Sequence, residues 1–292
     1  MTTLRVATRG SALALWQARH VASLLRAAHS GLEVTEVIVE TAGDRNREIP
    51  IAAIGGRGVF TKEVQAAVLD GRADLAVHSA KDLPSSAELQ PEGLVLAAVP
   101  ERADPRDALV GATLDAIPPG GTVGTGSVRR RAQLADRRPD LTFADLRGNI
   151  DTRLAKAPDF AAIVVAYAAL QRLGRTDAVA EVLEPTVMLP QVAQGALAIE
   201  SRPETAALLA AIEHAPTRRC VDAERSWLAT LGGGCDLPAG AFCTVNEDGA
   251  LRLRAVLATF DGRIVLRDEN DGDGVALAER MLANGGAHLL EA

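Results

Sequence analysis

The sequence predicts an α/β protein with two doubly wound domains and a small α+β domain that contains a three-stranded antiparallel sheet. Three observations support this prediction. Short apolar runs alternate with helix-like segments over about the first 200 residues, a pattern typical of βαβ units. The linker Pro100–Pro105 interrupts that rhythm, which then starts again. After Pro216 the pattern changes to strand-like alternation broken by Asp-Gly turns.

In the first α/β domain, each predicted helix begins at a polar residue and each predicted strand is a short run rich in apolar residues. Ser11 caps a helix that continues to about Ala28, and Thr61 opens a second helix that ends near Asp70. The predicted strands are Leu4–Ala7, Leu32–Val39, Leu75–His78 and Leu94–Val99. This order predicts a mostly parallel sheet with helices on both faces.

The second α/β domain repeats the alternation and closes near Pro190. Its predicted elements are the strands Thr122–Thr125, Leu141–Leu146 and Ile163–Ala166 and the helices Ser127–Ala135 and Asn149–Ala155. The strand and helix predicted in Ala196–His214 have no clear place in sequence order. Two such domains joined by short linkers predict a ligand cleft between them, at the carboxyl ends of the strands.

The last domain begins with a predicted helix from Thr217 to Thr230. Leu251–Val256 alternates as a half-buried strand does, and Asp248-Gly249 and Asp261-Gly262 are hairpin-turn dipeptides. The sequence from Asp273 to about Leu290 is typical of a closing helical segment.

Length and charge exclude several classes of protein. At 292 residues the chain is too long for one comfortable core, which agrees with several domains. The net charge of −7 disfavours a general nucleic-acid surface, because sequence-independent binding needs a basic face. Three cysteines make no disulfide framework and no signal peptide is present, so we expect a cytoplasmic protein. The longest apolar run, Ala161–Leu170, is too short to span a bilayer.

Two motifs at the ends of first-domain strands are candidate binding or catalytic sites. Arg9-Gly-Ser11 lies where a strand turns into a helix, a place that presents backbone N–H groups to an anion, although a surface arginine and an ordinary cap also explain it. Asp82 follows the third strand beside Lys81. A carboxylate there could stabilise a developing cation or handle protons, or it could be a turn residue before Pro84.

Arginines repeat at the strand ends of the second domain. Gly124-Thr-Gly-Ser127-Val-Arg129-Arg130-Arg131 matches neither a P-loop nor a dinucleotide fingerprint. Cations at a helix N-terminus are disfavoured by the helix dipole, which favours an anionic partner, although a solvated arginine face is an equal alternative. Arg147, Arg153 and Arg172 occupy similar places, where guanidiniums suit carboxylates.

Two glycine-rich loops complete the candidates. Gly55-Gly-Arg57-Gly58, with Lys62 beyond it, is either a linker or a basic lid. Cys235 follows three glycines that give its thiol unusual access, whereas a lone cysteine is usually buried and inert. A metal site is not expected, because Cys235 and Cys243 lie eight residues apart without a histidine cluster, and no histidine partner suggests a protease. Cys220 and Cys243 read as ordinary free cysteines.

Together these motifs resemble the porphobilinogen deaminase (hydroxymethylbilane synthase) family, in order over nearly the whole chain. The motifs are Ala7-Thr-Arg-Gly-Ser-Ala-Leu-Ala-Leu-Trp-Gln17, Gly58-Val-Phe-Thr-Lys-Glu63, Ala76-Val-His-Ser-Ala-Lys-Asp-Leu-Pro84, Gly124 to Arg130, Leu146-Arg-Gly-Asn149, Leu189-Pro-Gln-Val-Ala-Gln-Gly195 and Glu224 to Gly240.

The resemblance implies two domains like those of periplasmic binding proteins, followed by a third domain. The implied boundaries are 1–99 with 196–214 for domain 1, 100–195 for domain 2 and 215–292 for domain 3. It also implies a dipyrromethane cofactor, bound through a thioether to Cys235, on which four porphobilinogen molecules are joined with loss of ammonia before the linear tetrapyrrole is hydrolysed off.

The resemblance assigns roles to the candidate residues. Asp82 is the implied catalytic residue, which accepts pyrrole N–H bonds and stabilises positive charge. The implied cofactor-binding residues are Cys235, Lys81, Ser127, Arg129, Arg130, Arg147 and Arg153. The implied substrate-binding residues are Arg9, Ser11, Gln17, Arg147, Arg153 and Arg172. Arg57 and Lys62 belong to the possible lid, and no metal is implied.

Two rival functions remain beside this enzyme. One is a non-catalytic, two-lobed binding protein for an organic polyanion, which would not need Cys235 on its glycine loop. The other is an RNA-binding protein, which the negative charge and the scarcity of aromatic residues disfavour. We therefore expect a monomer whose partner is porphobilinogen, with neither nucleic acid nor membrane.

Overall fold

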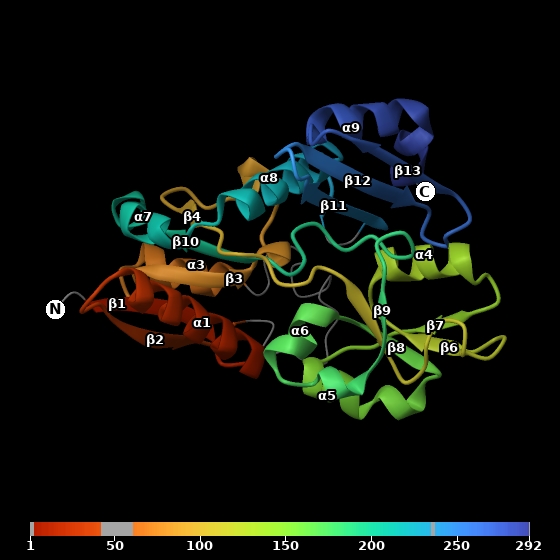
Figure 1. The fold of residues 1–292 in the computed structure, drawn as a ribbon, viewed down its shortest axis with the longest axis horizontal. Helices are drawn as coiled ribbons and strands as arrows, with labels where there is room; N and C mark the ends of the chain where they lie inside the picture. The colour runs from red at the N-terminus through yellow and green to blue at the C-terminus, as the bar shows by residue number, and fades with distance from the viewer. Residues whose placement is uncertain (1–2, 42–60, 235–236, 292) are drawn as a thin grey trace. The chain divides into compact units, whose positions relative to one another are not determined.

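The computed structural model describes residues 3–41, 61–234 and 237–291, and the chain divides into two compact units. The first unit comprises Met1–Ala103 and Ala196–Arg219, and the second comprises Asp104–Gly195 and Cys220–Ala292. Each unit contains one five-stranded sheet (Figure 1). The second unit also contains the three-stranded sheet, so a separate third domain from residue 215 stays a prediction.

The sheet of the first unit has the strand order β2-β1-β3-β10-β4. Its strands are β1 (Thr3–Arg9), β2 (Glu33–Val39), β3 (Leu75–Ser79), β4 (Val95–Ala98) and β10 (Leu197–Ser201). β1 runs parallel to β2 and β3, whereas β10 runs antiparallel to β3 and β4. Four of the five strands therefore run in the same direction, as expected of a mostly parallel sheet, and β10 is the exception. β10 enters this sheet after an excursion of the chain, which places the strand predicted in Ala196–His214 between β3 and β4.

Helices cover both faces of this sheet. Successive side chains of a strand point to opposite faces, so both faces carry apolar side chains that a helix can bury. α1 (Ala12–Ala28) begins at the predicted cap Ser11, whose Oγ accepts a hydrogen bond from the backbone N–H of Ala14 at 3.3 Å. Val6 of β1 packs on the α1 side, and its neighbour Ala7 packs on the side of α3 (Lys62–Leu69) with Val64. Both faces are thus buried, as expected of a doubly wound sheet.

The sheet of the second unit has the order β7-β6-β8-β5-β9 and the same mixture of directions. Its strands are β5 (Asp107–Val110), β6 (Thr122–Gly124), β7 (Thr142–Ala144), β8 (Ala162–Ala166) and β9 (Val179–Leu183). The sequence did not predict β5 and β9. β5 has only four residues and follows a proline-containing linker, so its pattern is too short to distinguish from a loop.

The helices of this second sheet lie at its strand ends and on both of its faces. α4 (Val128–Arg137) buries Leu134 against one face, where Val123 and Val164 also lie. α6 (Tyr167–Arg172) buries Leu170 on the opposite face, beside α5 (Ile150–Ala155).

The predicted three-stranded antiparallel sheet is confirmed, with β11 (Ala239–Val245), β12 (Leu251–Ala258) and β13 (Val265–Asn270). α8 (Ala215–Thr230) precedes it, and α9 (Gly274–Met281) and α10 (Ala287–Glu291) follow it. Instead of one closing helix, the chain kinks at Gly285, whose φ of +102° is left-handed. Gly274 brings α9 close to α8, since a Cβ there would lie 2.3 Å from the Ala223 carbonyl oxygen.

None of the helices within residues 3–41, 61–234 and 237–291 combines the length and the apolar character that crossing a membrane requires.

The two hairpin glycines offer a test of how the small sheet packs on α4. Gly249 and Gly262 both have left-handed φ angles, +82° and +72°. A Cβ on Gly249 meets nothing within 4 Å, but a Cβ on Gly262 would lie 2.4 Å from the Ala132 carbonyl oxygen of α4. We expect Gly249→Ala to lower the free energy of unfolding by about 1 to 2 kcal/mol through strain alone. Gly262→Ala should lose about 2 to 5 kcal/mol, because overpacking adds to the strain.

Urea unfolding of both variants measures the difference. Equal losses would show that the β12–β13 hairpin does not rest against α4 in solution.

Candidate active site

A pocket in the first unit gathers residues from the carboxyl ends of β1 and β3 and from the start of α1. Its lining includes Arg9, Ser11, Gln17, His78, Ser79 and Asp82. Four of these residues, namely Arg9, Ser11, Gln17 and Asp82, are site residues that the sequence predicted, and they come from segments up to about 70 positions apart. The structure therefore brings the two first-domain motifs together.

The α1 side of the pocket presents a helix N-terminus. Ser11 caps α1, and the next free N–H groups and the positive end of the helix dipole lie there, so this side favours an anionic group. Gln17 is buried, and its Nε2 donates to Ser79 Oγ at 2.9 Å. This bond ties α1 to the end of β3.

Asp82 stands on a short 3-10 turn, Ala80–Asp82, that follows β3 directly. The turn is anchored to the residue before β10, because Ala80 is buried and its backbone N–H donates to the Ala196 carbonyl at 3.0 Å. Asp82 itself is exposed on the pocket side, while its neighbour Lys81 is half-buried. The anchored turn thus fixes the position of an exposed carboxylate.

Behind this pocket lies a buried polar group that the sequence did not reveal. His78 Nε2 lies 3.2 Å from Glu200 Oε2, and Gln65 Nε2 donates to the same oxygen at 2.8 Å. The three side chains come from β3, β10 and α3, so no local spacing could have found them. His78 thereby connects the pocket lining to the centre of the sheet.

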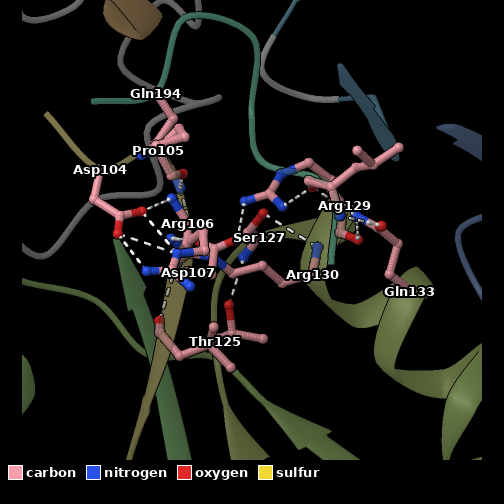
Figure 2. Close-up of polar contacts among 12 residues, drawn as sticks. Asp104, Pro105, Arg106, Asp107, Thr125, Ser127, Arg129, Arg130, Gln133 and Gln194 are labelled. Carbon is pink, nitrogen blue, oxygen red and sulfur yellow. Dashed lines mark hydrogen bonds and ion pairs between the residues drawn. The ribbon is translucent and has the colours of Figure 1, made fainter. Parts of the chain in front are cut away.

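In the second unit, Arg129 and Arg130 turn inward to one carboxylate, Asp107 of β5 (Figure 2). Arg129 Nη2 donates to Asp107 Oδ2 at 2.8 Å, and Arg130 Nη2 donates to Oδ1 at 2.7 Å. Gln194 Nε2 also donates to Oδ1, at 2.9 Å. The anionic partner that the helix dipole favours is therefore Asp107, a residue of the same chain. Arg131 points elsewhere and pairs with Asp145.

The electrostatics of this cluster follow from its burial. Burial by itself raises the pKa of the Asp107 carboxyl, but the charges of Arg129 and Arg130 outweigh it and hold that pKa well below its usual range. Burial also lowers the pKa of Arg129, against the opposing effect of Asp107. Two guanidiniums share one carboxylate, so the cluster keeps one excess positive charge. Arg129 Nε is buried without a hydrogen-bond partner in the described part of the chain.

Ser127 acts as the N-cap of α4, and its Oγ accepts from the Arg130 backbone N–H at 3.5 Å. The helix therefore starts where the sequence predicted. The cap sets the first turn so that the two following arginines face β5 rather than solvent, which explains why neighbouring residues can share one partner.

The remaining predicted arginines lie in the loop after β7 and in the last turns of α5 and α6. Arg147 follows β7 and is partly exposed, with Nη2 3.6 Å from Asp145 Oδ2. Arg153 Nε donates to the Gly148 carbonyl at 2.8 Å, and Arg172 Nη2 donates to the Gly195 carbonyl at 2.6 Å. Burial lowers the pKa of the Arg172 guanidinium to about 10. A bound anion would offset that burial.

Cys235 and Arg57 lie outside the described residues, and Lys62 is the exposed first residue of α3. The strand that follows Cys235 in sequence reaches the arginine cluster at Gly240. A Cβ there would lie 2.7 Å from the Pro190 carbonyl oxygen and 3.0 Å from Arg129 Cδ. Only glycine permits this approach of β11 to Arg129.

The described ranges hold no group of three or more His, Cys, Asp or Glu side chains placed to bind a metal ion.

Comparison with known proteins matches two family models. Residues 4–210 match "Porphobilinogen deaminase, dipyromethane cofactor binding domain", and residues 218–283 match "Porphobilinogen deaminase, C-terminal domain". Asp107 and Gln194, whose roles in the arginine cluster the sequence did not predict, fall in the first of these ranges.

Close relatives bear the same family name. A porphobilinogen deaminase of Nitratidesulfovibrio vulgaris (strain DP4) is 47% identical over 307 residues, which cover 100% of this chain and 96% of the relative. One from Syntrophus aciditrophicus is 45% identical and covers 99% of this chain and 98% of the relative. A solved structure of a Bordetella pertussis solute receptor, DctP7, is 13% identical with a TM-score of 0.39 over 73% of this chain and 77% of its own. That structural likeness is too weak to support an argument. The sequence identities extend over nearly the full length of the chain and are high enough to assign a family. The chain belongs to the porphobilinogen deaminase family.

Proposed function

We propose that the chain is a hydroxymethylbilane synthase. It joins four porphobilinogen molecules head to tail with release of one ammonia per condensation, and it then hydrolyses the linear tetrapyrrole from its primer. The observation that carries this proposal is the exposed carboxylate of Asp82, held in one pocket with Arg9 and the N-terminus of α1 in a chain that matches the family from end to end.

The residues present fit a dipyrromethane primer. Such a group carries carboxylate side arms, and the second unit offers Arg129 and Arg130 with one excess positive charge, an unpartnered Arg129 Nε, and the desolvated Arg172. The primer supplies a free pyrrole α-carbon to which the first substrate is joined. Cys235 would hold it through a thioether, and Lys81, Ser127, Arg147 and Arg153 would add hydrogen bonds and charge.

The pocket of the first unit suits the reacting end of the growing pyrrole chain. When ammonia leaves porphobilinogen, its methylene carbon becomes part of a cationic methylene-pyrrolenine. The bound primer would supply the pyrrole α-carbon that is joined to this methylene carbon, and the proton on that α-carbon would leave to solvent. Asp82 accepts hydrogen bonds from the pyrrole N–H groups and stabilises the cation. A carboxylate that is already fixed in place stabilises this charge well, because it needs no reorganisation during the reaction. Arg9, Ser11 and Gln17 hold the substrate's acid groups.

We also infer a cytoplasmic monomer, in which Arg57 and Lys62 act as a basic lid for the substrate. The chain has only three cysteines, which make no disulfide framework, and this supports a reducing compartment.

We expect Asp82→Asn to lower turnover by about 100-fold or more while the protein stays folded, because the charge that stabilises the cation is lost. Steady-state assay of porphobilinogen consumption measures it. Asp70→Asn is the matched control, since Asp70 is an exposed carboxylate at the end of α3, away from the pocket lining. Turnover within about threefold of the parent would remove Asp82 from the mechanism.

Cys235→Ser should yield a protein without the dipyrromethane adduct. Intact-protein mass spectrometry reads this directly and also separates the enzyme from a simple anion-binding protein. Cys243→Ala is the control and should keep the adduct, because the Cys243 side chain is buried in β11. An adduct that survives in Cys235→Ser would place the attachment elsewhere.

Arg172→Gln should raise KM for porphobilinogen by about tenfold and cause partly elongated pyrrole chains to accumulate, because a half-buried guanidinium that favours an anion is removed. Native mass spectrometry counts the substrate units on the enzyme. Arg175→Gln removes a nearby but exposed guanidinium, which pairs with Asp151, and should leave both readouts unchanged. Equal behaviour of the two variants would show that Arg172 serves the scaffold only.

A further inference from the structure

Ala193 is the only non-glycine residue in the described ranges with a left-handed backbone, at a φ of +60°. For an L-residue with a side chain this conformation is disfavoured by a factor of about 5 to 30. It persists only where the surroundings hold it, and such positions gather at functional sites. Ala193 is also completely buried, so solvent does not supply the hydrogen bonds of its backbone.

The group that holds Ala193 is the carboxylate of Glu224 on α8. Glu224 Oε2 accepts the Ala193 backbone N–H at 2.6 Å, and Oε1 accepts the Cys243 backbone N–H of β11 at 2.8 Å. The side chain of Glu224 is fully buried. One carboxylate therefore joins three segments, and hydrogen bonds to an ionised acceptor are the strong ones.

The segment that contains Ala193, Leu189–Gly195, supplies fixed partners to the arginine cluster. The Leu189 carbonyl accepts Arg129 Nη1 at 2.6 Å, and the Gly195 carbonyl accepts Arg172 Nη2 at 2.6 Å. Gln194, next to Ala193, donates to Asp107. A change in the backbone at Ala193 would therefore displace the acceptors of two proposed anion-binding arginines and one donor to their shared carboxylate.

A second anchor holds the same segment from α4. Gln133 Nε2 donates to the Leu189 carbonyl at 3.0 Å, and its Oε1 accepts the Leu189 N–H at 2.8 Å. Glu224 and Gln133 thus fix different parts of Leu189–Gly195, and the two anchors can be tested independently.

We propose that Glu224 is a positioning residue for catalysis. It holds the backbone of Ala193 in the left-handed conformation and so fixes the Leu189–Gly195 segment. That segment in turn orients Arg129 and Arg172 toward the carboxylates of the bound pyrrole chain. This inference rests on the proposed function. It predicts that Glu224 acts on substrate binding and elongation through the backbone, without itself touching the substrate.

The test is a double-mutant cycle with Glu224→Gln and Ala193→Gly. In Glu224→Gln the amide can accept one of the two backbone N–H groups but presents its NH2 to the other. We expect KM for porphobilinogen to rise about tenfold, with accumulation of partly elongated chains. Ala193→Gly in the Glu224→Gln background should lower this raised KM by about fivefold or more. The reason is that glycine adopts a φ of +60° without the steric penalty that alanine pays there.

Leu277→Ala is the control for a simple loss of stability. Leu277 is fully buried in α9, and its truncation should lower the thermal midpoint while KM stays unchanged, with no gain from Ala193→Gly. If Glu224→Gln gives no folded protein, Gln133→Leu removes the other anchor, and the same rise in KM is expected.

Unchanged KM in Glu224→Gln, or a rise that Ala193→Gly does not relieve, overturns the positioning role. These results are separable from failure of the proposed function, since in that case the unmodified chain would carry no dipyrromethane adduct and consume no porphobilinogen.

Discussion

The carboxylate of Asp107 is the constraint on which the second unit's site depends. It is completely buried, it receives both Arg129 and Arg130, and it stays ionised because those two charges outweigh its desolvation. Buried guanidiniums without such a partner would be strongly destabilising. Because the carboxylate is shared, the arginines are already in place before any ligand arrives, and their excess positive charge is directed by the protein.

The two units present different electrostatic environments. The first unit offers an exposed carboxylate, Asp82, near a helix N-terminus, so it suits a reacting centre where positive charge develops beside acid side arms. The second offers guanidiniums that are buried or half-buried and oriented by the carbonyl groups of Leu189 and Gly195, which suits the holding of carboxylates. A reaction that lengthens a polyanion by repeated loss of ammonia uses both kinds of environment.

Local sequence signals predicted much of this fold correctly. Ser11, Ser127 and Asn149 each cap the helix that was expected to start there, because an N-cap is an interaction between residues only three positions apart. The hairpin turns at Gly249 and Gly262 were also predicted correctly, from their Asp-Gly dipeptides. The direction of β10 could not be predicted from local signals, since its antiparallel course depends on where the chain returns to the first sheet.

By itself the sequence determined the helix caps, the hairpin turns, the succession of α/β units and the motifs that place the chain in its family. It also identified the residues Asp82, Arg9 and Arg129 as candidates. Only the tertiary structure decided that Arg129 faces Asp107 and that Glu224 holds Ala193, pairs separated by 22 and 31 positions. The physical reason is that burial makes a partner for each charge obligatory, whereas the packing of sheets and helices decides which group becomes that partner.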